Sequence, residues 1–99
     1  MIEPSELIEV LECFFIETPE ILNQCDQAIS SSDYALLKKL FHSLKGSTSN
    51  LHLEILSQLA AELEGRAESK DLTFVSNHTP ALRNEFFAFM EKFKNHFSR

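Results

Sequence analysis

Apolar residues recur at helical spacing along almost the whole chain, and this periodicity limits the fold more than any other feature. Successive apolar side chains stand three or four residues apart, which places them on one face of an α-helix rather than on one face of a strand. Only two glycines and three prolines occur in 99 residues, so few turns interrupt the pattern. The sequence therefore predicts an all-α fold.

Breaks in the pattern predict where the helices begin and end. A first helix starts near Pro4, and Thr18-Pro19-Glu20 has the cap, proline and early acid that are typical of a second helix start. A polar run at 30–33 precedes a third helix at 34–51, a fourth covers 53–67, and a last segment covers 72–97. The last segment contains Pro80 and an apolar stripe that keeps its phase across the proline, which favours one kinked helix over a restart. That stripe consists of Val75, Leu82, Phe86, Phe89, Phe93 and Phe97.

These segments together predict an antiparallel four-helix bundle with an additional short N-terminal helix that acts as a lid. Hydrophobic residues make up 43% of the chain, which is enough for one core at this length. No linker or repeat divides the sequence, so residues 1–99 are predicted to form a single domain.

Charge and cysteine usage exclude several classes of function. The formal net charge is −6, and a domain of that sign repels nucleic acids and anionic membranes. The N-terminal residues lack the features of a secretory signal and no apolar run could span a membrane, so we expect a cytoplasmic location. Cys13 and Cys25 have neither metal-site nor redox-motif spacing and are predicted to be two small buried side chains. The four histidines show no metal-ligand spacing either, so no metal is expected.

The predicted helix at 34–51 has two different faces. On a helical wheel, His42 lies opposite the apolar residues and is therefore expected to be exposed. The hemisphere that it occupies is otherwise small or basic. The apolar hemisphere carries Leu36, Leu37, Leu40, Leu44, Ser47, Thr48 and Leu51, and the His42 hemisphere carries Ala35, Lys38, Lys39, Lys45, Gly46 and Ser49.

The neighbours of His42 indicate phosphoryl chemistry. Lys45 and Gly46 follow His42 by one helical turn and so flank the imidazole. Glycine costs about 1 kcal/mol relative to alanine in a helix, but here it leaves space for the backbone of another protein. Lys45 is a mobile positive charge suited to a phosphoryl oxygen, and no acid occurs between Asp33 and Glu54. A neutral imidazole is a competent nucleophile near pH 7 and could attack a phosphoryl group in line.

The segment Leu40-Phe41-His42-Ser43-Leu44-Lys45-Gly46-Ser47-Thr48-Ser49-Asn50-Leu51 resembles the signature of histidine phosphotransfer domains, with looser similarity through Leu56, Leu59 and Leu63-Glu64. The resemblance implies that His42 accepts a phosphoryl group on its outer ring nitrogen, that Lys45 steadies this group, and that Gly46 clears the docking surface. It also implies that Glu64 bonds the inner ring nitrogen and orients the imidazole, with an ordinary solvated acid as the alternative. His52 stands where the family usually has glycine, so either His52 adopts a left-handed conformation or the turn differs.

The same resemblance implies a phosphorelay intermediate that takes a phosphoryl group from a receiver-domain aspartate and passes it to another receiver. The partners would be receiver domains of response regulators, or of a hybrid sensor histidine kinase, and each would bring its own magnesium. Docking would involve Lys38, Lys39, Gly46 and Ser49 around His42. The sequence has no recognised nucleotide-binding motif, so we expect a phosphoryl carrier rather than an enzyme, with no cofactor of its own. The absence of a predicted large apolar face favours a monomer.

A non-catalytic helical interaction module is the alternative function. Nine phenylalanines occur in the chain, and a partner could bind those in the last segment if they faced outward. Their regular stripe is better explained as part of a core. Uptake of a phosphoryl group that is lost on His42→Gln would distinguish the carrier from the module.

Overall fold

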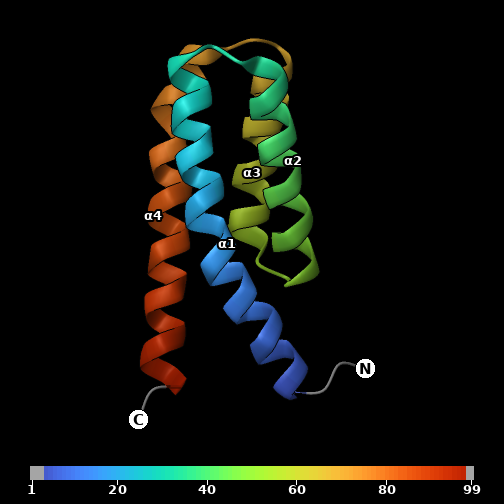
Figure 1. The fold of residues 1–99 in the computed structure, drawn as a ribbon, viewed down its shortest axis with the longest axis vertical. Coiled ribbons are helices and arrows are strands. Elements are labelled where there is room, and N and C mark those ends of the chain that lie inside the picture. Colours follow the sequence, from blue (N-terminus) through green and yellow to red (C-terminus); the bar gives the residue numbers. More distant parts are fainter. Residues whose placement is uncertain (1–3, 98–99) are drawn as a thin grey trace.

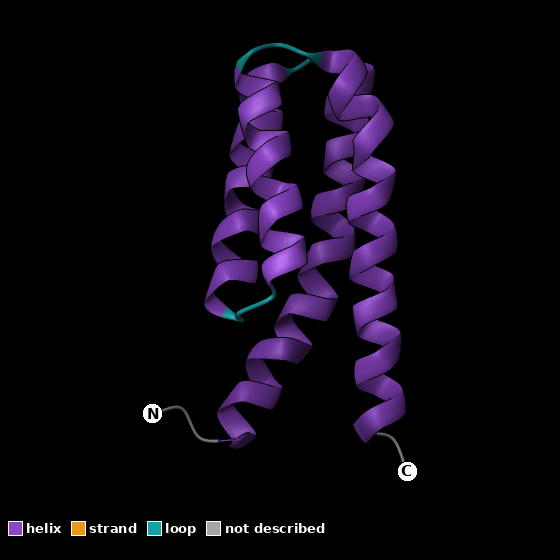
Figure 2. Cartoon of the chain, turned by 180° about the vertical axis from the view of Figure 1, so that it is seen from behind, coloured by secondary structure: helices purple, strands orange, loops and turns teal. Residues whose placement is uncertain are grey.

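The computed structural model describes residues 4–97, which form four helices arranged as an antiparallel bundle (Figure 1). Each helix packs against its neighbours in sequence, and α1 also packs against α4, which closes the bundle. Figure 2 shows the same helices from behind, joined by short loops, with no strand in the described range. The all-helical, four-helix prediction is thereby confirmed. The helices are α1 (Pro4–Ser30), α2 (Tyr34–Asn50), α3 (Glu54–Glu68) and α4 (Leu72–Phe97).

The N-terminal region differs from the prediction, because α1 is one continuous helix across Pro19. The predicted break at Thr18 and Pro19, and with it the separate short N-terminal helix, is wrong. Thr18 is buried and does not cap a new helix, and apolar contacts on both sides of the proline, through Phe14 and Leu22, hold the two halves in one helix. Packing has outweighed the local start signal and the hydrogen bond that Pro19 cannot donate. Figure 1 shows the N-terminal half of α1 leaning away from α4.

The phenylalanines fill the core, as the periodicity predicted. Phe14 and Phe86 are buried with ring centroids 5.3 Å apart, and Phe15 packs between Phe89 and Phe93 at 5.8 and 5.1 Å. α4 continues through Pro80, so the apolar stripe does belong to one helix. Val75, Leu82 and Phe86 of that stripe are buried, while the side chain of Phe97 and residues 1–3 and 98–99 lie outside the described part of the chain.

The two cysteines have different environments, which corrects half of the prediction. Cys25 is fully buried in the core, and this burial, together with the neighbouring Asp26 carboxylate, raises the pKa of its thiol from 9.0 to about 12. Cys25 therefore stays protonated and serves as a small apolar side chain. Cys13 is exposed, because it lies on a face of α1 away from the buried Leu11 and Phe14.

The three connections between helices have the same geometry. Each contains one left-handed residue that is not glycine: Ser32, His52 and Lys70 have φ of 53°, 58° and 61°. In each turn the following amide donates to a carbonyl five residues earlier, as in Leu53 N to Thr48 O at 2.9 Å. Asp33 and Asp71 then accept hydrogen bonds from the amides of Leu36 and Phe74 and so cap the next helix. His52 thus adopts the left-handed conformation that the sequence left as one of two options.

The surface of α1 departs from the premise behind the predicted monomer. Leu7, Ile8, Val10 and Ile16 are exposed on this helix, so an apolar surface does exist there. No helix within the described residues is both long and apolar enough to cross a membrane.

Candidate functional site

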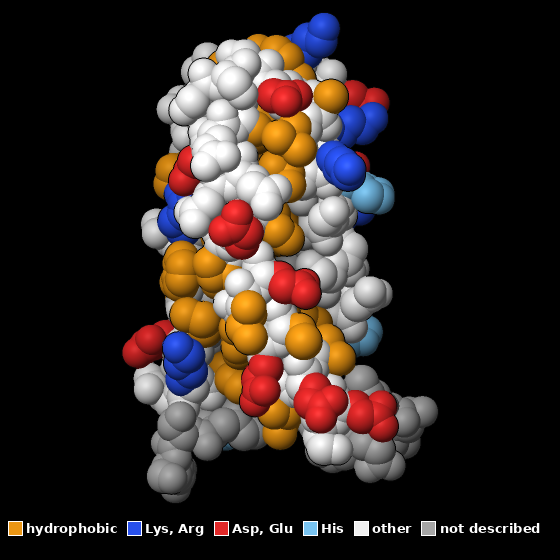
Figure 3. All heavy atoms as spheres, in the orientation of Figure 1, with side chains coloured by type: hydrophobic (Ala, Val, Ile, Leu, Met, Phe, Trp, Pro, Cys, Tyr) orange, Lys and Arg blue, Asp and Glu red, His pale blue; other side chains and the backbone are white. Residues whose placement is uncertain are grey.

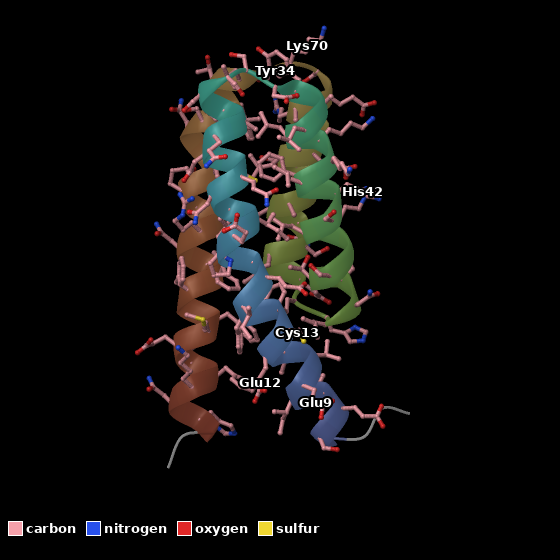
Figure 4. The ribbon with its side chains drawn as sticks, in the orientation of Figure 1. Glu9, Glu12, Cys13, Tyr34, His42 and Lys70 are labelled. Carbon is pink, nitrogen blue, oxygen red and sulfur yellow. The ribbon has the colours of Figure 1, made fainter. Side chains whose placement is uncertain are left out.

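His42 projects outward from the middle of α2. Its side chain is 69% exposed, and in Figure 4 it points away from the other three helices. The helical wheel explains this position, because the buried side chains of α2 all lie on the opposite side of the helix. Those buried residues are Leu37, Leu40, Phe41, Leu44 and Thr48.

Glu64 of α3 bonds the inner nitrogen of the His42 ring. The distance from His42 Nδ1 to Glu64 Oε2 is 2.8 Å, and the Glu64 side chain is only 16% exposed. The other carboxylate oxygen, Oε1, lies 3.5 Å from Lys45 Nζ. Because an ionised carboxylate can only accept, the ring donates through Nδ1–H, which in the neutral imidazole leaves the lone pair on Nε2. The contact therefore directs the nucleophilic nitrogen of His42 outward.

The register of the α2–α3 hairpin explains why these residues meet. His42 and Glu64 are 22 residues apart and lie equally far before and after Leu53, in the turn between the two helices. The same relation holds for Lys38 and Glu68, whose side chains pair at 3.1 Å, and for the hydroxyl groups of Ser49 and Ser57, 2.7 Å apart. Sequence reasoning did not identify Glu68 or Ser57. Pairing the two helices symmetrically about the predicted turn would have found both.

The predicted docking residues do not all line one surface hollow. An open hollow of about 470 Å³ beside His42 is lined by Ala35, Lys38, Lys39 and Glu64 as well. Lys45 joins this group through its contact with Glu64. Ser49 instead lines a second hollow with His52, Leu53, Glu54, Ser57 and Gln58. Gly46 is exposed, and a Cβ atom there would have no neighbour within 4 Å outside its own helix backbone and adjacent residues.

Charge is divided between two faces of the molecule. Lys38, Lys39 and Lys45 gather around His42 on α2, whereas α1 contains no lysine or arginine. Figure 3 shows this division, with basic and histidine side chains along the edge formed by α2 and acidic and apolar side chains over α1. The face around His42 is therefore suited to an anionic group or to an acidic partner surface. Within the described residues, no group of three or more His, Cys, Asp and Glu side chains could hold a metal ion.

The structure is thus an antiparallel helical bundle with an exposed histidine, a carboxylate on the inner nitrogen of that histidine, and lysines around it. These features define a class of protein that can carry a group on an imidazole. The comparison with protein families gives this class its name. A family model for the Hpt domain matches residues 9–89, and the chain belongs to this family. Hpt domains carry phosphoryl groups on a histidine in phosphorelays and interact with receiver domains of two-component systems. Neither a curated protein nor a solved structure gives a match to the chain.

Proposed function

We propose that His42 is the phospho-acceptor and that this protein shuttles a phosphoryl group between the aspartates of two receiver domains. The observation that carries the proposal is the 2.8 Å contact between His42 Nδ1 and Glu64, on a side chain that is otherwise exposed. This contact supports Nε2 as the reacting nitrogen, because it occupies Nδ1 and leaves the rest of the ring exposed to another protein.

The transfer follows from this geometry. The Nε2 lone pair forms a bond to phosphorus while the bond from phosphorus to the receiver's aspartate oxygen breaks, and its electron pair returns to that carboxylate. The Nδ1 proton stays on the ring, hydrogen-bonded to Glu64, whose negative charge stabilises the positive charge that the imidazole gains. Transfer to the next receiver runs the same step in reverse, and Nε2 recovers its electron pair.

The remaining parts of the proposed site belong to positioning and charge. Lys45 steadies the phosphoryl oxygens after its ammonium group has left Glu64 Oε1. At 3.5 Å this contact is longer than the 2.8 Å contact between Glu64 and His42. Gly46 lets the receiver's backbone approach the ring. A receiver domain would bring its own magnesium ion, which would neutralise charge on the phosphoryl group. The lysines around His42 face the acidic pocket of the receiver, and the exchange takes place in the cytoplasm.

The alternative of a purely binding module finds less support in the packing. It required outward-facing phenylalanines in the last helix, but Phe86 is fully buried, Phe89 and Phe93 are partly buried, and only Phe87, at 39%, counts as exposed among those described on α4. The phenylalanine stripe therefore belongs mainly to the core, and the exposed apolar side chains of α1 lie outside the last helix on which this alternative was based.

Intact-protein mass after incubation with phosphorylated receiver domains tests the proposal. We expect the wild type to gain one phosphoryl group that is lost on mild acid treatment, and His42→Gln to gain none. His78→Gln is the matched control, because His78 is also an exposed helical histidine but lies on α4. Equal labelling of wild type and His42→Gln, or no labelling of the folded wild type by any receiver, would contradict the proposal.

A further inference from the structure

The three lysines around His42 differ in how their charges are already engaged. Lys38 Nζ is held by Glu68 Oε1 at 3.1 Å, and Lys45 Nζ lies 3.5 Å from Glu64 Oε1. The side chain of Lys39 makes no ion pair or hydrogen bond within the described residues. Of the three ammonium groups, that of Lys39 is therefore the one not committed to a carboxylate.

The position of Lys39 differs as well. Lys38 and Lys45 pair with carboxylates of α3, so both lie on the α3 side of His42. Because each residue of an α-helix is rotated by about 100° from the one before, Lys39 lies on the other side of His42. Lys39 nevertheless lines the open hollow that contains the His42 ring, and residues three apart on a helix are surface neighbours. His42 thus has the Glu64 carboxylate on its inner nitrogen, and Lys39 lies one helical turn away on the side opposite Lys38 and Lys45.

This arrangement has a consequence for the order of events during transfer. A phosphoryl group that approaches Nε2 carries negative oxygens, and an unpaired cation can meet them without first breaking another contact. Lys45 must leave Glu64 before it can do the same, and its departure changes the carboxylate that orients the ring. Lys38 would have to leave Glu68.

We propose that Lys39 is a catalytic residue of the phosphotransfer step, whose ammonium group binds the phosphoryl oxygens while the group moves between the receiver aspartate and His42 Nε2. This inference rests on the phosphotransfer function proposed above. Lys39 adds no bond to the chemistry: it stabilises charge on the moving group, and the N–P and P–O bonds form and break as already described.

The test is the rate of transfer from a phosphorylated receiver to the full chain, measured by rapid quench over a range of receiver concentrations. We expect Lys39→Gln to lower the rate at saturating receiver about tenfold, which corresponds to about 1.4 kcal/mol of transition-state stabilisation. Lys39→Arg keeps the charge and should recover most of the rate. Lys38→Gln removes an equal charge from a predicted docking residue and should lower the saturating rate less than Lys39→Gln does. The charge-matched Lys92→Gln on α4, outside the site, should lower that rate less than about twofold.

Three outcomes would overturn the inference while leaving the proposed function intact. Lys39→Gln could transfer as fast as Lys92→Gln, Lys38→Gln could be as slow as Lys39→Gln, or only the receiver concentration needed for half-maximal rate could change. The last result would mean that Lys39 contributes to docking and not to the transfer itself. A folded wild type that takes up no phosphoryl group on His42 would instead overturn the proposed function, and this inference with it.

Discussion

Replacement of Gly46 separates what this glycine does for the fold from what it does for the site. Gly46 lies inside α2 without a positive φ, and an added Cβ would meet open space. Alanine therefore introduces no clash and removes the helix penalty of glycine, so Gly46→Ala should raise the free energy of unfolding by about 1 kcal/mol. For a domain of this size that is a rise in melting temperature of about 4–8 °C, measured by circular dichroism.

Gly65 provides an internal control for this prediction. It lies inside α3, is also exposed, and a Cβ there would likewise meet no atom within 4 Å. Gly65→Ala should therefore stabilise the protein by a similar amount. The two positions should differ in transfer rate when the new side chain is long. Gly46→Gln should slow transfer from a receiver at least about tenfold, because residue 46 lies one turn from His42, whereas Gly65→Gln should change the rate much less. A Gly46→Ala variant that melts no higher than wild type, or a Gly46→Gln variant that transfers normally, would refute the argument that this glycine serves docking.

Three further variants probe the site and the turn beside it. Lys45→Glu should slow transfer more than about tenfold, while the free energy of unfolding should change by less than about 1 kcal/mol because the Lys45 side chain is 44% exposed. A loss of several kcal/mol in urea unfolding would mean that Lys45 supports the core. Glu64→Gln keeps the shape of the side chain but replaces a charge-assisted hydrogen bond to His42 with a neutral one, a difference of about 1 kcal/mol. We therefore expect transfer to be about fivefold slower in rapid-quench experiments, with Glu68→Gln as the control. His52→Gly should raise the free energy of unfolding by about 0.5–1 kcal/mol, because φ of 58° is strained for histidine and not for glycine, and an unchanged denaturation midpoint would show that the turn relaxes in solution.

The boundaries of three helices could be predicted from the sequence, because apolar periodicity and turn signals agree there. The predicted 34–51, 53–67 and 72–97 segments end within a residue of α2, α3 and α4. The predicted break in α1 failed because Thr18 and Pro19 carry a local start signal whose outcome depends on contacts distant in sequence. Phe14 packs on Phe86 of α4, and this contact fixes the helix on the N-terminal side of the proline. A single sequence contains the start signal but not the packing that overrides it.

The candidate site was partly predictable for a different reason. The exposure of His42 follows from the wheel of one helix, which requires no knowledge of any other element. Which lysines are engaged does not follow from one helix, because the partners Glu64 and Glu68 belong to α3. The distinction between Lys39 and its two neighbours therefore appears only when both helices are placed side by side.

The turn at Leu51–Leu53 links these observations, since it sets the register in which α2 meets α3. His42 with Glu64 and Lys38 with Glu68 pair symmetrically about Leu53. One residue inserted into this turn would shift the register of α3 against α2 by one position. Each α3 side chain at a given height along α2 would then be rotated by about 100° about the α3 axis. Glu64 would then lie away from Nδ1 unless α3 slid along the bundle, which would displace its own buried residues Leu56, Ala60 and Leu63 from the core. The left-handed conformation of His52 closes this tight turn, and the turn keeps the Glu64 carboxylate opposite His42.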